Sequence, residues 1–333
     1  MAGPWLPDAY ELTGVTQGTN TTESYTYDPV GNRLSSLGVS PYSVNVSNQL
    51  TSTPSTTYTY DSNGNMLTKT DSTGTTSYAW DFENRLTSVT MPSTRGTIAA
   101  FKYDPFGRRI SKVFVREGRP TGSSRYAYDG DNLIEETNAF GAVVARNSQG
   151  LNIDEPLAML RGGATSYYHA DGLGSVTSLS NPAAALAQTY AFDSYGKQTA
   201  VSGSLTNPFR YTAREFDSET NLYFYRARYY DPASGRFLSE DPMQFNAGEN
   251  FYRYVGNNPG NSVDPFGLNT LPIYLPWWWI PGFGDAAGTA IVRVIGATGR
   301  LIGGTTTAVL GLTLFAVQRC IRMHQSPRNS TAS

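Results

Sequence analysis

The sequence predicts an all-β protein whose strands form one extended, wound sheet of stacked hairpins. The 333-residue chain has 22 tyrosines, and aromatic side chains favour strands. It also has 33 glycines among many serines and threonines, a composition typical of tight turns. Finally, a short aromatic motif recurs along most of the chain, and a repeat indicates architecture more firmly than local propensity does.

The recurring unit has the pattern aromatic-x-aromatic-Asp-x-x-Gly-x-x-Leu. Clear copies are YTYDPVGNRL, YTYDSNGNML, YAWDFENRL and FKYDPFGRRI, and looser copies follow them. The aspartates of the repeat are Asp28, Asp61, Asp81, Asp104, Asp129, Asp171, Asp193 and Asp231. Most consecutive aspartates are 20 to 25 residues apart, which is enough for two short strands and two turns.

Each unit is expected to form one β-hairpin. The alternating aromatic residues place two rings on one face of a strand, and Asp-x-x-Gly then reverses the chain. An Asp carboxylate accepts hydrogen bonds from backbone N–H groups two residues on, and Gly adopts a positive φ without steric cost. Turn chemistry therefore explains these aspartates better than catalysis, and sheet packing explains the Tyr pairs better than a carbohydrate platform. Stacked hairpins over residues 1–207 would bury their rings together and pair their edges.

A second module, residues 208–268, lacks the simple period and is denser in aromatic residues, Arg, Asn and Pro. Its arginines alternate with aromatic side chains, a pattern that could stack on nucleic acid. However, acidic residues of the same module balance them, and the whole chain has a formal net charge of −2. Internal ion pairs are the better interpretation, so no nucleic-acid partner is expected.

Three Asp-Pro pairs in this module begin at Asp231, Asp241 and Asp264. Proline pushes the preceding residue towards an extended backbone, so each carboxylate has a defined direction. Two carboxyl groups that share one proton can activate a water against a peptide bond, because neighbouring like charges raise one pKa and leave the other group ionised. Gly267 permits a close backbone approach, and Leu268 offers an apolar side chain to a pocket. Since Asp-Pro turns are common, these residues alone are only suggestive of catalysis.

The repeats are followed by NLYFYRARYYDPASGRFLSEDP and NFYRYVGNNPGNSVDPFGL. Together with the repeats, this text over residues 25–268 resembles the Rhs/YD-repeat family with its repeat-associated core domain. The resemblance implies a hollow β-shell wound from the repeats and a core domain that plugs one end. It also implies that the core domain is an aspartic autoprotease that cleaves after the Leu of DPxGL. The segment released inside such a shell is typically a toxin or effector.

Carried onto this sequence, the resemblance places the scissile bond between Leu268 and Asn269. It makes Asp241 and Asp264 the catalytic pair. It also makes Arg236 a supporting charge that orients a carboxylate or the substrate carbonyl. The implied partners are the remaining shell segments or a partner shell protein, with the chain's own tail as cargo.

The predicted tail domain, residues 269–333, is hydrophobic, and a helix is one interpretation of it. Leu301–Gln318 is a run of 18 uncharged residues, just inside the range for a membrane span. Trp277–Trp279 could lie at lipid headgroups. Membrane contact by the tail and simple coating of the shell interior are both open interpretations.

No cofactor or metal site is expected. Cys320 is the only cysteine, and His169 and His324 are the only histidines, too few for a His-rich metal site. His169 is interpreted as an ordinary strand residue. The tail has no nucleotide-binding or catalytic-triad motif.

The start of the sequence, MAGPWLPDAY, lacks the basic and apolar regions of an ordinary signal peptide. Secretion or cell-surface display would therefore need another route.

Seven or eight repeat units are few for a large cavity, so we expect this chain to be part of a longer shell. Asp231 is a third, less favoured catalytic candidate. The alternative function is a non-catalytic structural or cell-surface protein whose Tyr-rich sheet binds glycans or another cell.

Overall fold

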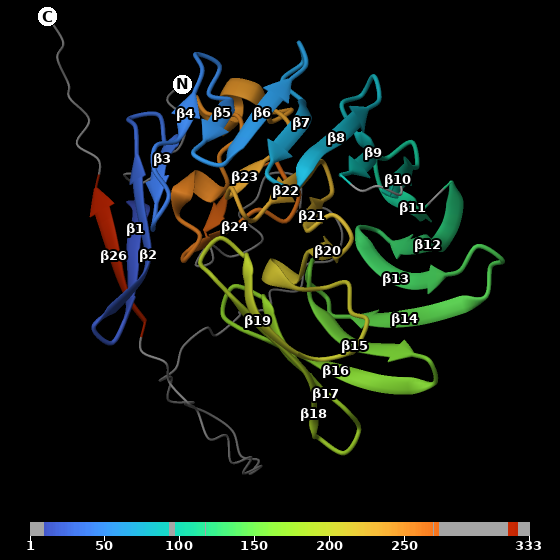
Figure 1. Cartoon of the computed structure of the whole chain (residues 1–333). Helices are drawn as coiled ribbons and strands as arrows, with labels where there is room; N and C mark the ends of the chain where they lie inside the picture. Colours follow the sequence, from blue (N-terminus) through green and yellow to red (C-terminus); the bar gives the residue numbers. More distant parts are fainter. Residues whose placement is uncertain (1–9, 93–96, 117, 269, 273–318, 326–333) are drawn as a thin grey trace, which may run out of the picture.

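The computed structural model describes residues 10–92, 97–116, 118–268, 270–272 and 319–325 (Figure 1). All regular elements in these ranges are β-strands or short 3-10 helices, which confirms the all-β prediction. Most of the tail lies outside the described residues, including Trp277–Trp279 and Leu301–Gln318. Its two described elements are strands, β25 (Leu271–Pro272) and β26 (Arg319–Gln325), where the sequence had suggested a helix. No helix among the described residues is long and apolar enough to cross a membrane.

Sixteen strands form one antiparallel sheet in which each strand pairs with the next along the chain. They are β4 (Ser43–Val44), β5 (Leu50–Thr53), β6 (Thr56–Tyr60), β7 (Met66–Asp71), β8 (Gly74–Trp80), β9 (Leu86–Met91), β10 (Thr97–Tyr103), β11 (Arg109–Arg116), β12 (Arg119–Asp129), β13 (Asn132–Thr137), β14 (Val143–Gln149), β15 (Pro156–Arg161), β16 (Ala164–Ala170), β17 (Val176–Ser180), β18 (Leu186–Phe192) and β19 (Gln198–Gly203). This unbroken order is the wound sheet that the repeat predicts.

A second sheet has the order β26-β1-β2-β3, with β1 (Tyr10–Gln17), β2 (Asn20–Tyr27) and β3 (Arg33–Ser36). The two sheets together curl around the yellow and orange strands in the centre of Figure 1. The hydroxyl of Tyr27, on β2, lies 2.7 Å from the hydroxyl of Tyr195, which is in the turn after β18. The first hairpin and the last one are therefore in contact.

The turn aspartates act as the repeat predicts. In each regular turn, one carboxylate oxygen accepts hydrogen bonds from the backbone N–H groups two and four residues later, at 2.8–3.1 Å. These residues are Asp28, Asp61, Asp81, Asp104, Asp171 and Asp193. Asp129 differs, since it pairs with Asn132 across a two-residue loop. Three asparagines that the sequence pattern missed make the same turn, namely Asn45, Asn138 and Asn181.

The two aromatic residues have different tasks in most units, although Phe192 occupies the second position after Tyr190. The first ring is buried against the core, as at Tyr25, Tyr58, Tyr78, Phe101 and Tyr190. The second is also partly buried, but its polar atom donates a hydrogen bond of 2.6–3.1 Å to a carbonyl of an earlier strand. These pairs are Tyr27 with Leu12, Tyr60 with Leu50, Trp80 with Met66, Tyr103 with Leu86, and Tyr128 with Arg109. Tyr and Trp therefore suit this second position better than Phe does, because Phe has no donor.

Replacing Tyr60 with Phe tests this assignment. The variant keeps the ring but leaves the carbonyl of Leu50 without its 3.1 Å donor, so we expect a loss of about 1 kcal/mol in the free energy of unfolding. Chemical denaturation measures this loss. Tyr78→Phe is the control at a first position, since no described residue hydrogen-bonds its hydroxyl, and it should change stability less. Equal losses in the two variants would contradict the distinction.

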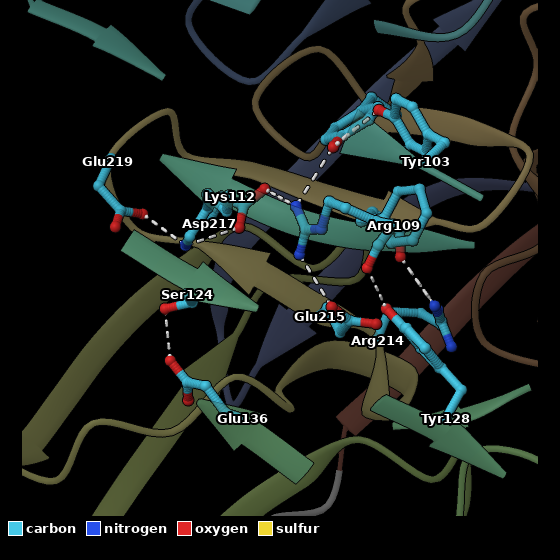
Figure 2. Close-up of polar contacts among 12 residues, drawn as sticks. Tyr103, Arg109, Lys112, Ser124, Tyr128, Glu136, Arg214, Glu215, Asp217 and Glu219 are labelled. Carbon is cyan, nitrogen blue, oxygen red and sulfur yellow. Dashed lines mark hydrogen bonds and ion pairs between the residues drawn. The ribbon is translucent and has the colours of Figure 1, made fainter. Parts of the chain in front are cut away.

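The central strands are β20 (Glu215–Asp217), β21 (Leu222–Tyr225), β22 (Arg228–Asp231), β23 (Arg236–Phe237) and β24 (Ser262–Val263), with 3-10 helices η1 (Tyr211–Ala213), η2 (Gln244–Ala247) and η3 (Val255–Asn257). We call residues 208–268 the core module and residues 10–207 the shell. Two buried clusters each combine residues of both parts, for example Leu86 with Phe224 and Tyr190 with Tyr223. A buried ion-pair network also joins β11 to β20 (Figure 2). The sheet is thus packed directly onto the core module.

Candidate functional site

One arginine lies between the two aspartates that the sequence singled out. Arg228, the first residue of β22, places Nη2 2.8 Å from Oδ2 of Asp241 and 3.5 Å from Oδ2 of Asp264. Because both Oδ2 atoms contact the same nitrogen, the two carboxylates lie close to each other. Asp241 precedes η2 and Asp264 follows β24, so the tertiary fold and not the local sequence brings them to one guanidinium.

The same arginine also binds the backbone of the DPFGL segment, residues 264–268. Arg228 donates through Nε to the carbonyl of Gly267, and the N–H of Ala227 donates to the carbonyl of Phe266 at 3.1 Å. Arg226 donates through Nη1 to the carbonyl of Pro265. Three consecutive carbonyls are thus bound by three consecutive residues, which holds the segment at a fixed position against the start of β22.

The segment turns in the same way as a repeat turn. Oδ1 of Asp264 accepts a hydrogen bond of 3.0 Å from the N–H of Leu268, four residues later. Gly267 has a φ of +68°, and a Cβ at this position would lie 2.4 Å from the carbonyl oxygen of Tyr225. Only glycine combines this φ with this close approach. The sequence predicts a close backbone approach at Gly267, and the carbonyl of Tyr225 is the group that approaches.

The site is buried and charged. Asp241, Asp264 and Arg228 are 4%, 3% and 3% exposed, so their charges have little access to water. Burial raises the pKa of the Asp241 carboxyl above its usual range, and Arg228 opposes this shift only in part. Burial also lowers the pKa of the Arg228 guanidinium, and the two carboxylates oppose this shift only in part. Asp241 therefore holds its proton at a higher pH than an ordinary aspartate does.

The model of the teneurin YD-shell family matches residues 9–260. The chain belongs to this family. The match agrees with the resemblance to YD-repeat proteins that the repeat and core motifs indicated. It ends before the DPFGL segment, so it covers the shell and most of the core module of this YD-shell chain.

Relatives of this YD-shell chain include much longer proteins. It is 35% identical over 273 residues to the tRNA3(Ser)-specific nuclease WapA of Bacillus spizizenii, covering 77% of this chain and 11% of that protein. It is 34% identical over 203 residues to the probable deoxyribonuclease RhsA of Dickeya dadantii, covering 59% of this chain and 14% of that protein. The crystal structure of TcdB2-TccC3-TEV superposes with a TM-score of 0.50 at 21% identity, covering 74% of this chain and 15% of that chain. This last likeness shows a shared fold.

Not every residue singled out in the sequence lies at this site of the YD-shell. Arg236 donates to Oδ1 of Asn32 at 3.2 Å and to the carbonyl of Asn48, so its polar contacts are with shell turns. Asp231 forms an ion pair with Lys69 at 3.1 Å and accepts the N–H of Ala233 at 2.8 Å, as a turn residue does. Asn269, which the sequence predicts on the far side of the scissile bond, lies outside the described residues.

Arg228 is the site residue that sequence reasoning missed. It stands in the text RARYYDP beside Arg226, and both were interpreted together as partners of internal ion pairs. The signal in the sequence is that Arg228 directly precedes the aromatic pair Tyr229 and Tyr230, since an arginine buried among such side chains needs carboxylates or carbonyls as partners.

The described part of the YD-shell offers no cluster of three or more His, Cys, Asp or Glu side chains that could hold a metal ion. His169 lies on β16, where its Nε2 is 2.9 Å from the hydroxyl of Ser180 on the neighbouring strand. This contact fits the interpretation of His169 as an ordinary strand residue.

Proposed function

We propose that the core module cleaves its own chain between Leu268 and Asn269 by an aspartic mechanism. One observation carries this proposal. Asp241 and Asp264 approach the same nitrogen of Arg228, and Asp264 also binds the N–H of Leu268, the residue whose carbonyl would be attacked. Paired carboxylates next to a fixed peptide are the arrangement that peptide hydrolysis by acid and base catalysis needs.

The proposed reaction assigns different roles to the two carboxylates. Asp264, as the base, takes a proton from a water whose oxygen attacks the carbonyl carbon of Leu268. Asp241, whose pKa is raised by burial, is the proposed acid and gives its proton to the departing amine of Asn269 as the C–N bond breaks. The products are a carboxyl group on Leu268 and a free amine on Asn269, so the atoms of one water are consumed.

Arg228 gives this pair a feature that the sequence did not predict. The expected arrangement was two carboxyl groups that share one proton, whereas here they share a guanidinium nitrogen. The positive charge lowers the repulsion between the two groups, so they can stay close when one or both are ionised. Its bond to the carbonyl of Gly267 also ties the carboxylates to the substrate segment. We therefore assign the supporting charge to Arg228, where the sequence had favoured Arg236.

The larger role of the chain follows from its relatives. We infer that it is part of a toxin-type shell, completed by further shell segments or a partner protein, with residues 269–333 as its effector cargo. Support comes from relatives that are called nucleases, of which this chain spans 11% and 14%. This proposal includes an effector activity of the tail, contact of the tail with a membrane, and secretion or surface display.

Mass spectrometry of the expressed full chain tests self-cleavage. We expect two polypeptides, one that ends at Leu268 and one that begins at Asn269. A folded chain that stays at a single intact mass would contradict the proposal and favour the non-catalytic structural or glycan-binding alternative. Circular dichroism of the same sample establishes that the chain is folded.

The rate of cleavage should depend on pH through Asp241. Its pKa lies above the ordinary range, so the proton to be donated is present at low pH and is lost as the pH rises through that pKa. We expect the rate constant to fall with rising pH on this limb. Cell-free synthesis followed by a pH jump and gel analysis over time measures it. A rate that rises steadily with pH would contradict the role of Asp241 as the acid.

A further inference from the structure

We propose that Asp154, in a loop of the shell, is a positioning residue for the cleavage segment. It lies between β14 and β15, far in sequence from residues 264–268. Its effect would pass through Arg226, which binds both Asp154 and the carbonyl of Pro265. This inference rests on the proposed self-cleavage, but its structural part can be tested separately.

Asp154 is the point at which two arginines of the core module converge. Arg226 donates through Nη2 to Oδ1 of Asp154 at 2.7 Å and through Nη1 to Oδ2 at 3.1 Å, a two-bond pairing. Arg214 donates to the same Oδ1. The side chain of Asp154 is 11% exposed and those of Arg214 and Arg226 are 3% and 14% exposed, so water screens these charges poorly.

The two arginines differ in how firmly they are held. Arg214 also donates through Nε and Nη2 to the carbonyl of Phe224, at 3.2 and 2.9 Å, which fixes it against β21. Without the carboxylate of Asp154, two buried guanidinium groups would face each other, and the pKa of Arg214 is already lowered by burial and by Arg226. Arg226 keeps bonds to the backbone carbonyls of Asp131 and Pro265, but it is the one expected to move, because its side chain is 14% exposed and that of Arg214 only 3%.

Movement of Arg226 would release the start of the cleavage segment. The carbonyl of Pro265 would lose its donor, and Pro265 directly follows Asp264, which carries the proposed base. Reaction rates are sensitive to such shifts, since a displacement of about 1 Å can cost about 100-fold. In this way cleavage would require that the loops carrying Asp131 and Asp154 are already packed on the core module, so that an incompletely folded shell does not cut its chain.

The test uses Asp154→Asn in the full chain, which keeps the size of the side chain and removes its charge. We expect cleavage to slow by about 10- to 100-fold in a cell-free synthesis time course. Glu136→Gln is the matched control, since Glu136 is 15% exposed and pairs with Arg161 and Ser124 within the shell strands. The control should cleave at the normal rate. Arg226→Met should resemble Asp154→Asn, and the double variant should lose no more than the more severe single one, because both act through one contact.

Amide exchange supplies the second measurement. In chains held intact by Asp241→Asn, adding Asp154→Asn should speed exchange of the peptide that covers residues 264–268, and adding Glu136→Gln should not. If the unmodified chain cleaves but Asp154→Asn cleaves like the control, the role of Asp154 is refuted while self-cleavage stands. If the unmodified chain does not cleave, self-cleavage fails, and the exchange result alone decides whether Asp154 holds the segment. Unchanged exchange in Asp154→Asn would refute the inference in either case.

Discussion

Replacing Asp264 with Asn is expected to abolish release of residues 269–333. The amide keeps the shape of the side chain and can still accept the N–H of Leu268, which now lies 3.0 Å from Oδ1. It cannot take a proton from water at neutral pH, so the attack on the carbonyl of Leu268 loses its base. Loss of a general base typically slows a reaction by about 100- to 10,000-fold. Intact-mass measurement over several hours after synthesis detects this change.

Asp241→Asn should have the same consequence for a different reason, because it removes the proton donor. Asp231→Asn is the matched control for both variants. It is also a buried Asp-Pro carboxylate of the core module, 5% exposed, but it pairs with Lys69 and not with Arg228. We expect Asp231→Asn to cleave normally. If Asp264→Asn and Asp241→Asn both fold and still release the tail, the assigned pair is wrong.

The second large effect is expected for Arg109→Met, which breaks the network that joins the shell to the core module (Figure 2). Arg109 on β11 is 1% exposed and donates to Asp217 at 2.5 Å, to Glu215 at 2.8 Å and to the hydroxyl of Tyr229 at 3.2 Å. Methionine fills a similar volume but leaves two carboxylates buried with too little positive charge. Breaking a buried ion pair in this way costs about 3 to 5 kcal/mol of stability.

Chemical denaturation in an Asp264→Asn background measures this loss in an uncleaved chain. The control is Arg146→Met, because Arg146 pairs with Glu135 at 2.8 Å but its side chain is 61% exposed. Exposed pairs contribute about 0 to 1 kcal/mol, so this variant should unfold nearly like its parent. Similar losses in the two variants would mean that burial of the Arg109 network contributes little.

The same network predicts how stability depends on acid. Burial alone would raise the pKa of Asp217, but Arg109 and Lys112 outweigh it, so the pKa lies below its ordinary value. The folded chain then binds a proton less readily than the unfolded chain. The contribution of Asp217 is present above the unfolded pKa, about 4, and is lost as the pH falls through the folded value. Arg109→Met should weaken this acid dependence, which denaturation between neutral and acidic pH can measure.

The repeat was sufficient to predict the sheet, because its signals act between residues close in sequence. The carboxylate of Asp104 reaches the N–H groups of its own turn, and Tyr58 alternates with Tyr60 on one strand. Such patterns require no knowledge of distant parts of the chain. A repeat pattern written with Asp does not include the asparagine turns, although Asn181 forms the same two hydrogen bonds.

The site depended on a different kind of information. The Asp-Pro pairs at Asp241 and Asp264 and the glycine at position 267 can be identified without a structure, since their backbone preferences depend on single residues and their neighbours. In contrast, the packing of distant strands places Arg228 between the two carboxylates and directs Arg236 to Asn32. A buried arginine takes whichever partners the packing of distant strands places within reach, and no spacing along the chain encodes that choice.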